Sequence, residues 1–217
     1  MSMLLEMPED LKAPTRQERR REKTRASLIG AAQVLFAGKG VEATAIAEIT
    51  EAADVGFGSF YNYFDSKDEI AEAVLEAAME EQKAALFALI DPLTDPAESV
   101  ALAHAFLVRQ AIGDPNFGWL LVRLDASHRL LIKALGDRAR QDIRDGVKAH
   151  RFVTADPEVS FFGTGGALLL VMRALLDGDL GDDAGVRHCE GVLRMLGVSG
   201  EEVEDIARRA NEAVTPG

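Results

Sequence analysis

The stretch GKGVEATAIAEITEAADVGFGSFYNYFDSKDEI, residues 38–70, decides the fold of this 217-residue chain. Within it, the spacing of apolar residues predicts one short helix over about 45–52 and another over about 57–64. The sequence Asp54-Val55-Gly56 between them is typical of a tight turn, because aspartate and glycine tolerate left-handed backbone geometry. Two short helices joined in this way form a helix-turn-helix, whose second helix can enter the major groove of DNA.

A longer amphipathic helix is predicted ahead of this unit, over about 17–37. Its apolar stripe consists of Leu28, Ile29, Ala32, Leu35 and Phe36. Thr15 and Glu18 have the spacing of a capping box at its start, and Ser66 and Glu69 have the same spacing at the start of a fourth helix. Gly38 and Gly40 are expected to end the first helix.

Residues from Thr24 to Leu75 resemble the DNA-binding domain of the TetR family of transcriptional regulators. The residues that carry the resemblance are Phe36, Gly40, Thr44, Ile49, Val55, Gly58, Tyr61, Tyr63-Phe64 and Ser66-Lys67. The resemblance implies a one-component repressor that a small-molecule ligand releases from a palindromic operator in double-stranded DNA.

The resemblance also implies roles for individual residues. Tyr61, Tyr63 and Lys67 fall where the family contacts phosphates, and Thr44 falls where it reaches the DNA backbone. The groove-facing side of the recognition helix would present Phe57, Ser59 and Asn62. The small core of the domain would contain Ile49, Val55, Phe60 and Phe64.

The chain departs from the family pattern at four positions. Ala45 and Gly56 stand where hydroxyl residues usually cap the two short helices, and Asp54 replaces a common turn glycine. Phe57 replaces a residue that is often polar, and two interpretations stay open: contact with a thymine methyl group, or extension of the Phe60–Phe64 core. The losses at Ala45 and Gly56 favour an alternative function, a ligand-independent DNA-binding or dimerisation protein with altered DNA contacts.

The charge distribution also indicates a nucleic-acid partner. Between Lys12 and Ala45 there are eight Lys/Arg residues and three acids, a local charge of +5, so the remainder must carry −17 to give the net charge of −12. Several of these cations open a helix, where the macrodipole disfavours positive charge. Phosphate is the partner that would explain their placement.

Helical periodicity continues to the end of the chain, and strand alternation is nowhere convincing. The fold class is therefore all-α, with further helices expected over about 67–90, 97–112, 116–125, 127–150, 157–177, 183–196 and 200–213. We expect a disordered N-terminal arm over residues 1–15, a helix-turn-helix domain over 16–65, and a helical-bundle domain for ligand sensing and dimerisation over 66–217.

Candidate sites in the second domain are less specific. Aromatic and basic side chains in its central helices are candidates to line a ligand pocket: Phe106, Trp119, Arg123, His128 and Phe162. An apolar, glycine-containing segment permits two interpretations, tight packing within the chain or a subunit interface. A later apolar stripe favours the second, a homodimer interface that includes Gly163, Gly166, Leu170, Val192 and Leu196. His104 and His188 are expected to be isolated.

Other classes of protein are excluded or disfavoured. One cysteine rules out a disulfide framework, and no metal site or cofactor is expected. The absence of a phosphate-binding glycine loop, a nucleophile elbow and clustered catalytic carboxylates argues against an enzyme. No leader is recognised and no stretch is judged long and apolar enough to cross a bilayer, so we expect a cytoplasmic protein without a membrane partner.

Overall fold

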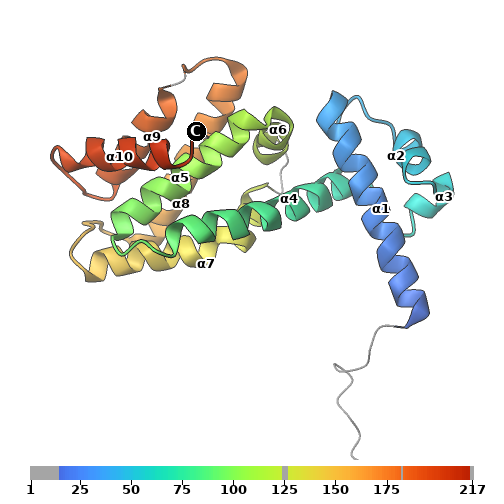
Figure 1. Ribbon diagram of the computed structural model, residues 1–217, viewed down its shortest axis with the longest axis horizontal. Coiled ribbons are helices and arrows are strands. Elements are labelled where there is room, and N and C mark those ends of the chain that lie inside the picture. The colour runs from blue at the N-terminus through green and yellow to red at the C-terminus, as the bar shows by residue number, and fades with distance from the viewer. Residues whose placement is uncertain (1–14, 124–126, 182, 216–217) are drawn as a thin grey trace, which may run out of the picture. The chain divides into compact units, whose positions relative to one another are not determined.

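The computed structural model describes residues 15–123, 127–181 and 183–215, and the predicted N-terminal arm over 1–15 lies almost wholly outside them. The described residues form ten helices and no strands, as the sequence predicts (Figure 1). The helices are α1 (Arg16–Lys39), α2 (Ile46–Ala52), α3 (Phe57–Phe60), α4 (Lys67–Ile90), α5 (Pro96–Gly113), α6 (Pro115–Arg123), α7 (Ser127–Lys148), α8 (Pro157–Asp177), α9 (Ala184–Met195) and α10 (Glu202–Ala213).

The chain divides into two compact units, with the boundary between Ile70 and Ala71 inside α4. The N-terminal unit contains α1, α2 and α3. Its core brings together buried side chains from all three helices, from the turn after α3 and from the start of α4, namely Leu28, Phe36, Ile49, Phe60, Phe64 and Ile70. Val55, which was expected in this core, is half-buried.

Local hydrogen bonds explain where the helices of the N-terminal unit begin and end. The capping box of Thr15 and Glu18 is confirmed. Gly40, with φ 81°, ends α1 and donates its N–H to the carbonyl of Phe36. Asp54 has the left-handed φ of 55° that the turn between α2 and α3 requires.

Helix α3 is shorter than predicted, ending at Phe60 rather than at residue 64. The chain needs residues 61–66 to turn from α3 into α4. In that turn the N–H groups of Tyr63 and Phe64 both bond to the carbonyl of Phe60. Ser66 accepts from the N–H of Glu69 as expected, but the Glu69 carboxylate accepts from Asp65 instead of closing the box on Ser66.

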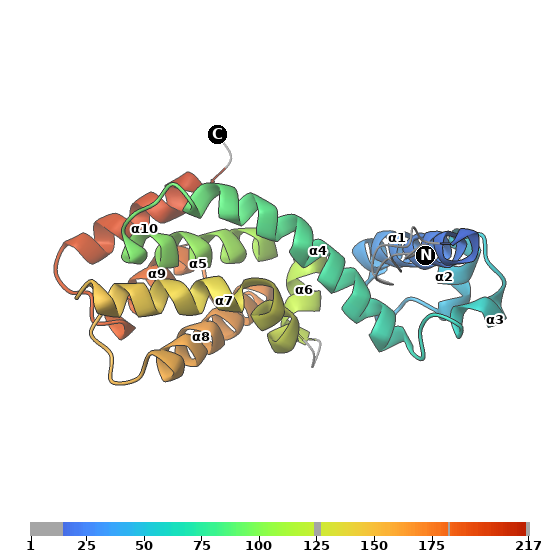
Figure 2. The same ribbon diagram turned by 90° about the horizontal axis from the view of Figure 1, so that it is seen from below.

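The C-terminal unit is built around α5, which packs against α6, α7, α8, α9 and α10 (Figure 2). Alanines at positions 97, 101, 105 and 111 are almost fully buried along α5, and their small side chains allow neighbouring helices to approach closely. Helix α5 therefore packs against five other helices and also contributes to the wall of the cavity described below.

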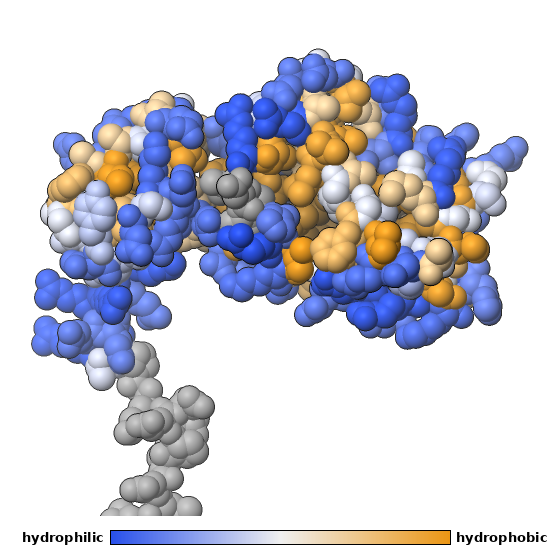
Figure 3. Space-filling view, turned by 180° about the vertical axis from the view of Figure 1, so that it is seen from behind, coloured by the Kyte–Doolittle hydropathy of each residue, from blue (hydrophilic) through white to orange (hydrophobic). Residues whose placement is uncertain are grey.

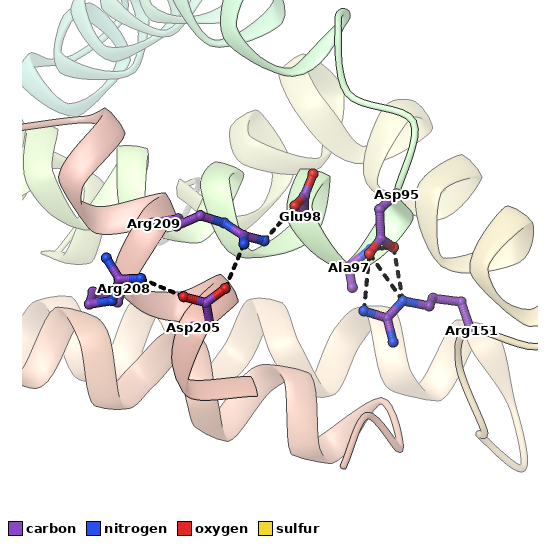
Figure 4. Close-up of polar contacts among 7 residues, drawn as sticks. All are labelled: Asp95, Ala97, Glu98, Arg151, Asp205, Arg208 and Arg209. Atoms are coloured by element: carbon purple, nitrogen blue, oxygen red, sulfur yellow. Dashed lines mark hydrogen bonds and ion pairs between the residues drawn. The ribbon is translucent and has the colours of Figure 1, made fainter. Parts of the chain in front are cut away.

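Charged residues fasten α10 and the loop after α7 to the start of α5 (Figure 4). Asp95 caps α5 by accepting from the N–H of Ala97, and it receives hydrogen bonds of 3.0–3.1 Å from the Arg151 guanidinium. Arg151 also bonds Glu202 at the start of α10, and Arg209 of α10 bonds Glu98 of α5.

Helix α8 contradicts the expectation that no stretch is long and apolar enough to cross a bilayer. By length and composition alone it could cross a membrane, with a mean hydropathy of 1.7 over its most apolar window. The expectation that no stretch is long and apolar enough is therefore wrong. The reason is that α8 has apolar residues on several sides: Phe161, Leu168 and Met172 are buried, whereas Phe162 and Leu170 are exposed. One such helix is weak evidence for a membrane span.

Candidate DNA interface and effector cavity

A polar groove of about 680 Å³ lies between the first half of α1 and the turn and helix around α3. Helix α1 contributes Gln17, Arg20, Arg21 and Thr24 to its lining. Residues around α3 contribute Val55, Gly56, Ser59, Asn62 and Tyr63. The groove therefore combines two cations with the predicted base-reading residues Ser59 and Asn62, which suits a surface that takes a phosphate backbone.

Two aromatic rings are exposed, one at the first residue of α3 and one at the residue that follows the helix. Phe57 is 54% exposed and Tyr61 is 51% exposed, and their rings meet edge to face at a centroid distance of 5.9 Å. Tyr61 also meets the buried ring of Phe60 at 5.4 Å. This exposure overturns the interpretation that Phe57 extends the core, and it leaves the ring on the surface beside Tyr61.

Tyr63 and Lys67 lie at the edge of the same unit, and each is partly exposed. The Arg21 guanidinium lies over the Tyr63 ring, 5.9 Å from its centroid. Lys67 donates from Nζ to the backbone carbonyl of Glu42. That bond fastens the start of α4 to the loop before α2 while leaving the other ammonium hydrogens for a further acceptor.

Thr44 does not have the accessibility that its predicted role needs. Its residue surface is only 2% exposed, and its hydroxyl donates to the carbonyl of Gly40 at 2.7 Å. The side chain therefore stabilises the turn after α1 from inside, and we withdraw the prediction that it reaches the DNA backbone.

Ala45 provides no side-chain cap for α2, but the other half of a capping box is present. The N–H of Ala45 donates to the Glu48 carboxylate at 2.9 Å, and Lys39 holds the same carboxylate at 2.6 Å. The Lys39 and Ala45 hydrogen bonds lower the pKa of Glu48 and keep it charged. Half of a capping box is thus retained, whereas Gly56 provides no side-chain cap for α3.

The C-terminal unit contains a cavity of about 90 Å³ between α4, α5, α7 and α8. Its walls are mainly apolar, with Leu86, Leu107, Leu131, Leu135, Phe161 and Leu168 among the lining residues. Polar groups in the walls are His104 from α5, Arg138 and Asp142 from α7, and Thr164 from α8.

The cation and the carboxylate in this wall are already paired. Arg138 donates from Nε to both oxygens of Asp142 at 3.0 and 3.2 Å, and from Nη1 to Asp91 at 2.6 Å. Burial raises the pKa of Asp142, and the hydrogen bond from Arg138 opposes this without cancelling it. The cavity therefore offers a polar pair fixed in one orientation within an apolar chamber.

None of the five residues predicted to bind a ligand lines this cavity. Phe106 is buried in the bundle, and Phe162 and His128 are exposed. Trp119 stacks against Arg123, whose guanidinium lies 3.6 Å from the ring centroid. Helix periodicity alone could not show which faces of α4, α5, α7 and α8 meet around a common space.

The predicted dimerisation residues fall into two groups. Val192 and Leu196 are 1% and 0% exposed, because α9 uses them to pack within its own chain, and they are unavailable to a second chain. Gly163, Gly166 and Leu170 of α8 are exposed. The sequence interpretation missed further apolar residues at the surface of α8 and α9, namely Val159, Phe162 and Met195. Figure 3 views the side of the unit on which α8 lies, and apolar side chains gather there.

Known proteins match both units. The family described as bacterial regulatory proteins, tetR family, matches residues 28–74, and the family described as tetracyclin repressor-like, C-terminal domain, matches residues 95–209. The crystal structure of RolR in complex with resorcinol is 38% identical and has a TM-score of 0.80, covering 88% of this chain and 96% of RolR.

Curated relatives are also regulators. HbdR of Aromatoleum sp. (strain CIB), an HTH-type transcriptional regulator, is 30% identical over 134 residues, which are 59% of this chain and 58% of HbdR. The repressor KstR2 of Rhodococcus jostii (strain RHA1) is 35% identical over 57 residues, or 26% of this chain. The chain thus spans 58% and 28% of the lengths of these two relatives.

The two family models match the two units in turn, first the helix-turn-helix unit and then the helical bundle. The chain belongs to the TetR family of bacterial regulatory proteins.

Proposed function

We propose that the chain is a transcriptional repressor that binds a palindromic operator as a homodimer and leaves it when a small aromatic effector fills the cavity of the C-terminal unit. The observation that carries this proposal is that one chain contains both a cationic groove and an apolar cavity. The N-terminal unit exposes a cationic groove beside the recognition helix. The C-terminal unit contains a partly open apolar cavity with a few oriented polar groups, as ligand sites do.

On the DNA side, Tyr61, Tyr63 and Lys67 are the proposed phosphate donors. Phe57, Ser59 and Asn62 are the proposed readers of base edges, because α3 and the turn after it expose them wholly or in part. Arg20 and Arg21 join the phosphate-contacting set, although the sequence interpretation had not singled them out. Their place in the groove that Asn62 also lines supports this addition.

The proposed dimer face is the exposed side of α8 with the neighbouring end of α9. Its apolar residues are Val159, Phe162, Leu170 and Met195, each at least 51% exposed in the single chain. Gly163 and Gly166 lie in the same stretch, and a methyl group added at Gly166 would meet no atom within 4 Å. A second copy of α8 could therefore approach this face closely, as C2 homodimers require of a shared surface.

The proposed effector class is a single aromatic ring with one or two hydroxyl groups. The cavity volume of about 90 Å³ is below the roughly 150 Å³ of an engineered cavity that accommodates benzene, so one small ring is the largest ligand of this class that it can contain, and the walls must move apart slightly to admit it. The polar residues in the walls offer partners to hydroxyl groups. The likeness to RolR, whose structure contains resorcinol, supports the same class.

Calorimetry with resorcinol tests the effector assignment. Gly165 lines the cavity, and a Cβ placed there meets no atom within 4 Å. Gly165→Leu should therefore fill the cavity and abolish resorcinol binding. Gly113→Leu, at an equally open position outside the cavity lining, is the matched control and should bind as the wild type does. Equal binding by Gly165→Leu would remove this cavity as the effector site.

The alternative of a ligand-independent DNA-binding or dimerisation protein is less well supported. Glu48 offsets the loss at Ala45, and the C-terminal unit retains a cavity.

A further inference from the structure

Two histidines that the sequence interpretation treated as isolated form a pair inside the C-terminal unit. His104 of α5 and His188 of α9 have Nδ1 and Nε2, respectively, 2.9 Å apart, and their ring centroids are 5.1 Å apart. His188 is 7% exposed and does not line the cavity, whereas His104 does. The pair therefore connects the cavity wall to a helix behind it.

The pKa of each imidazole lies below its ordinary value of 6.5, which favours the neutral form. Burial, reinforced by repulsion from His188, lowers the pKa of His104 to about 3, and burial lowers the pKa of His188 to about 4. One hydrogen must then lie between the two facing nitrogens, because a neutral imidazole carries a single N–H.

Two arrangements of that hydrogen are available. If Nδ1 of His104 donates to Nε2 of His188, then Nε2 of His104 is a bare acceptor. If Nε2 of His188 donates instead, Nε2 of His104 carries a hydrogen and is a donor. A ligand that donates from a hydroxyl group to Nε2 of His104 selects the first arrangement, and Nε2 of His188 then accepts from Nδ1 of His104 without any change of charge.

The other polar side chains in the cavity walls have bonds within the protein. Arg138 and Asp142 are bound to each other. The hydroxyl of Thr164 donates to the carbonyls of Ser160 and Phe161. The histidine pair occupies only Nδ1 of His104, which leaves Nε2 for a ligand.

We propose that Nε2 of His104 accepts a hydrogen bond from an effector hydroxyl, and that His188 is the positioning residue that holds His104 in the accepting tautomer. This inference rests on the proposed effector class and adds the residue that distinguishes a hydroxylated ring from a plain one. His188 does not line the cavity, so it affects ligand binding only through its hydrogen bond with His104.

Calorimetry with phenol and toluene measures the contribution of the ligand hydroxyl group to binding, because the two ligands differ only in having OH or CH3 on the ring. His104→Phe should weaken phenol binding about tenfold, the order expected for one buried hydrogen bond, and change toluene binding less than about twofold. His188→Leu should weaken phenol binding similarly, because His104 then loses the acceptor that selects its tautomer. His188→Gln should restore part of it, since the amide oxygen can accept from Nδ1 of His104, although the amide NH2 can also donate to Nδ1 and favour the other tautomer.

The outcomes separate the inference from the effector class on which it rests. If the wild type binds neither phenol nor resorcinol, both are wrong. If it binds phenol and the His104 and His188 variants bind it equally well, the effector class stands and the inference is overturned. A loss of toluene binding equal to the loss of phenol binding would likewise overturn it, because the variants would then have altered the shape of the cavity.

A spectroscopic measurement on the wild type needs no variant to fold. The chain has four histidines, so long-range proton–nitrogen spectra of the 15N-histidine-labelled protein resolve each ring. With phenol bound, we expect His104 to be neutral and protonated on Nδ1. A charged ring, or one protonated on Nε2, would overturn the inference.

Discussion

The hydroxyl of Tyr61 is the sharpest test of the DNA contacts at the residue scale. Its ring is held by edge contacts with Phe57 and Phe60, so Tyr61→Phe keeps the packing and removes one hydrogen-bond donor. A hydrogen bond to a charged phosphate contributes about 1.5–3 kcal/mol, and a symmetric dimer loses it twice. We expect operator affinity to fall at least about a hundredfold, as measured by fluorescence anisotropy.

The thermal melt of Tyr61→Phe should match that of the wild type. Unchanged operator affinity alongside matching melts would show that Tyr61 only packs against its aromatic neighbours. Asn62→Ala should behave differently, changing the preference among operator variants and leaving binding to random duplexes nearly intact.

Single residues show where sequence reasoning succeeds and where it fails. The turn at Asp54 and the capping box of Thr15 follow from local chemistry, and both were predicted. The burial of Thr44 and the exposure of Phe57 depend on contacts between helices, which a one-dimensional pattern does not contain. The His104–His188 pair joins residues 84 positions apart, so only the packing of α9 against α5 reveals it.

At the scale of an element, the exposed side of α8 predicts the oligomeric state. Leu170 is 73% exposed in the single chain. In a C2 dimer, the Leu170 side chains of both subunits would be buried in the interface. Leu170→Glu should therefore dissociate the dimer, because an unpaired buried carboxylate costs about 3–5 kcal/mol. Sedimentation velocity gives the mass directly.

Val34→Glu is the matched control, since Val34 of α1 is equally exposed at 73% but lies in the other unit. Its mass should stay that of the wild type. A dimer that persists in Leu170→Glu at micromolar concentration would remove this side of α8 from the interface.

The start of α5 gives a prediction about stability. Burial opposes ionisation of Asp95, but hydrogen bonds from Arg151 and Ala97 outweigh it, so the pKa lies below the ordinary value of 3.8. Asp95→Ala removes the cap and the ion pair and should lower the free energy of unfolding by about 1–2 kcal/mol at neutral pH. Chemical denaturation measures this difference.

Asp95→Asn retains a capping side chain and should cost less than the alanine variant. A carboxylate whose folded pKa is lowered stabilises the protein above its unfolded pKa, and this contribution is lost as the pH falls through the folded value. The difference between wild type and Asp95→Ala should therefore shrink only below about pH 4. A difference independent of pH would assign the effect to packing.

Helix positions were predictable because apolar periodicity and caps are local, and all ten helices of the described residues appear close to their expected ranges. The shortened α3 was missed because its end is set by the turn into α4. The cavity was missed because four helices contribute to its walls. Val192 and Leu196 were assigned to a dimer interface but are buried within their own chain. An apolar stripe in the sequence does not show whether it packs within the chain or against a second chain.

At the scale of the whole molecule, the uneven charge predicts how DNA binding responds to salt. The net charge is −12, yet residues 12–45 carry +5. Because local cations meet the phosphates, binding should weaken steeply as salt rises. With about six phosphates neutralised, the slope of log K against log salt should be near −5. A flat response would contradict the phosphate contacts, and Arg21→Gln should make the slope shallower by about one unit for each phosphate that is no longer neutralised.

The central claim is that one chain couples a cavity to an operator, and effector-driven release tests it most directly. A duplex selected from a random pool by the protein is labelled, bound, and titrated with resorcinol while anisotropy is recorded. We predict that resorcinol weakens operator binding about 10–100-fold in the wild type, a usual range for coupling between two sites, and that Gly165→Leu stays bound at the same concentrations. An operator complex that persists in the wild type when calorimetry shows the cavity saturated with resorcinol would contradict the account.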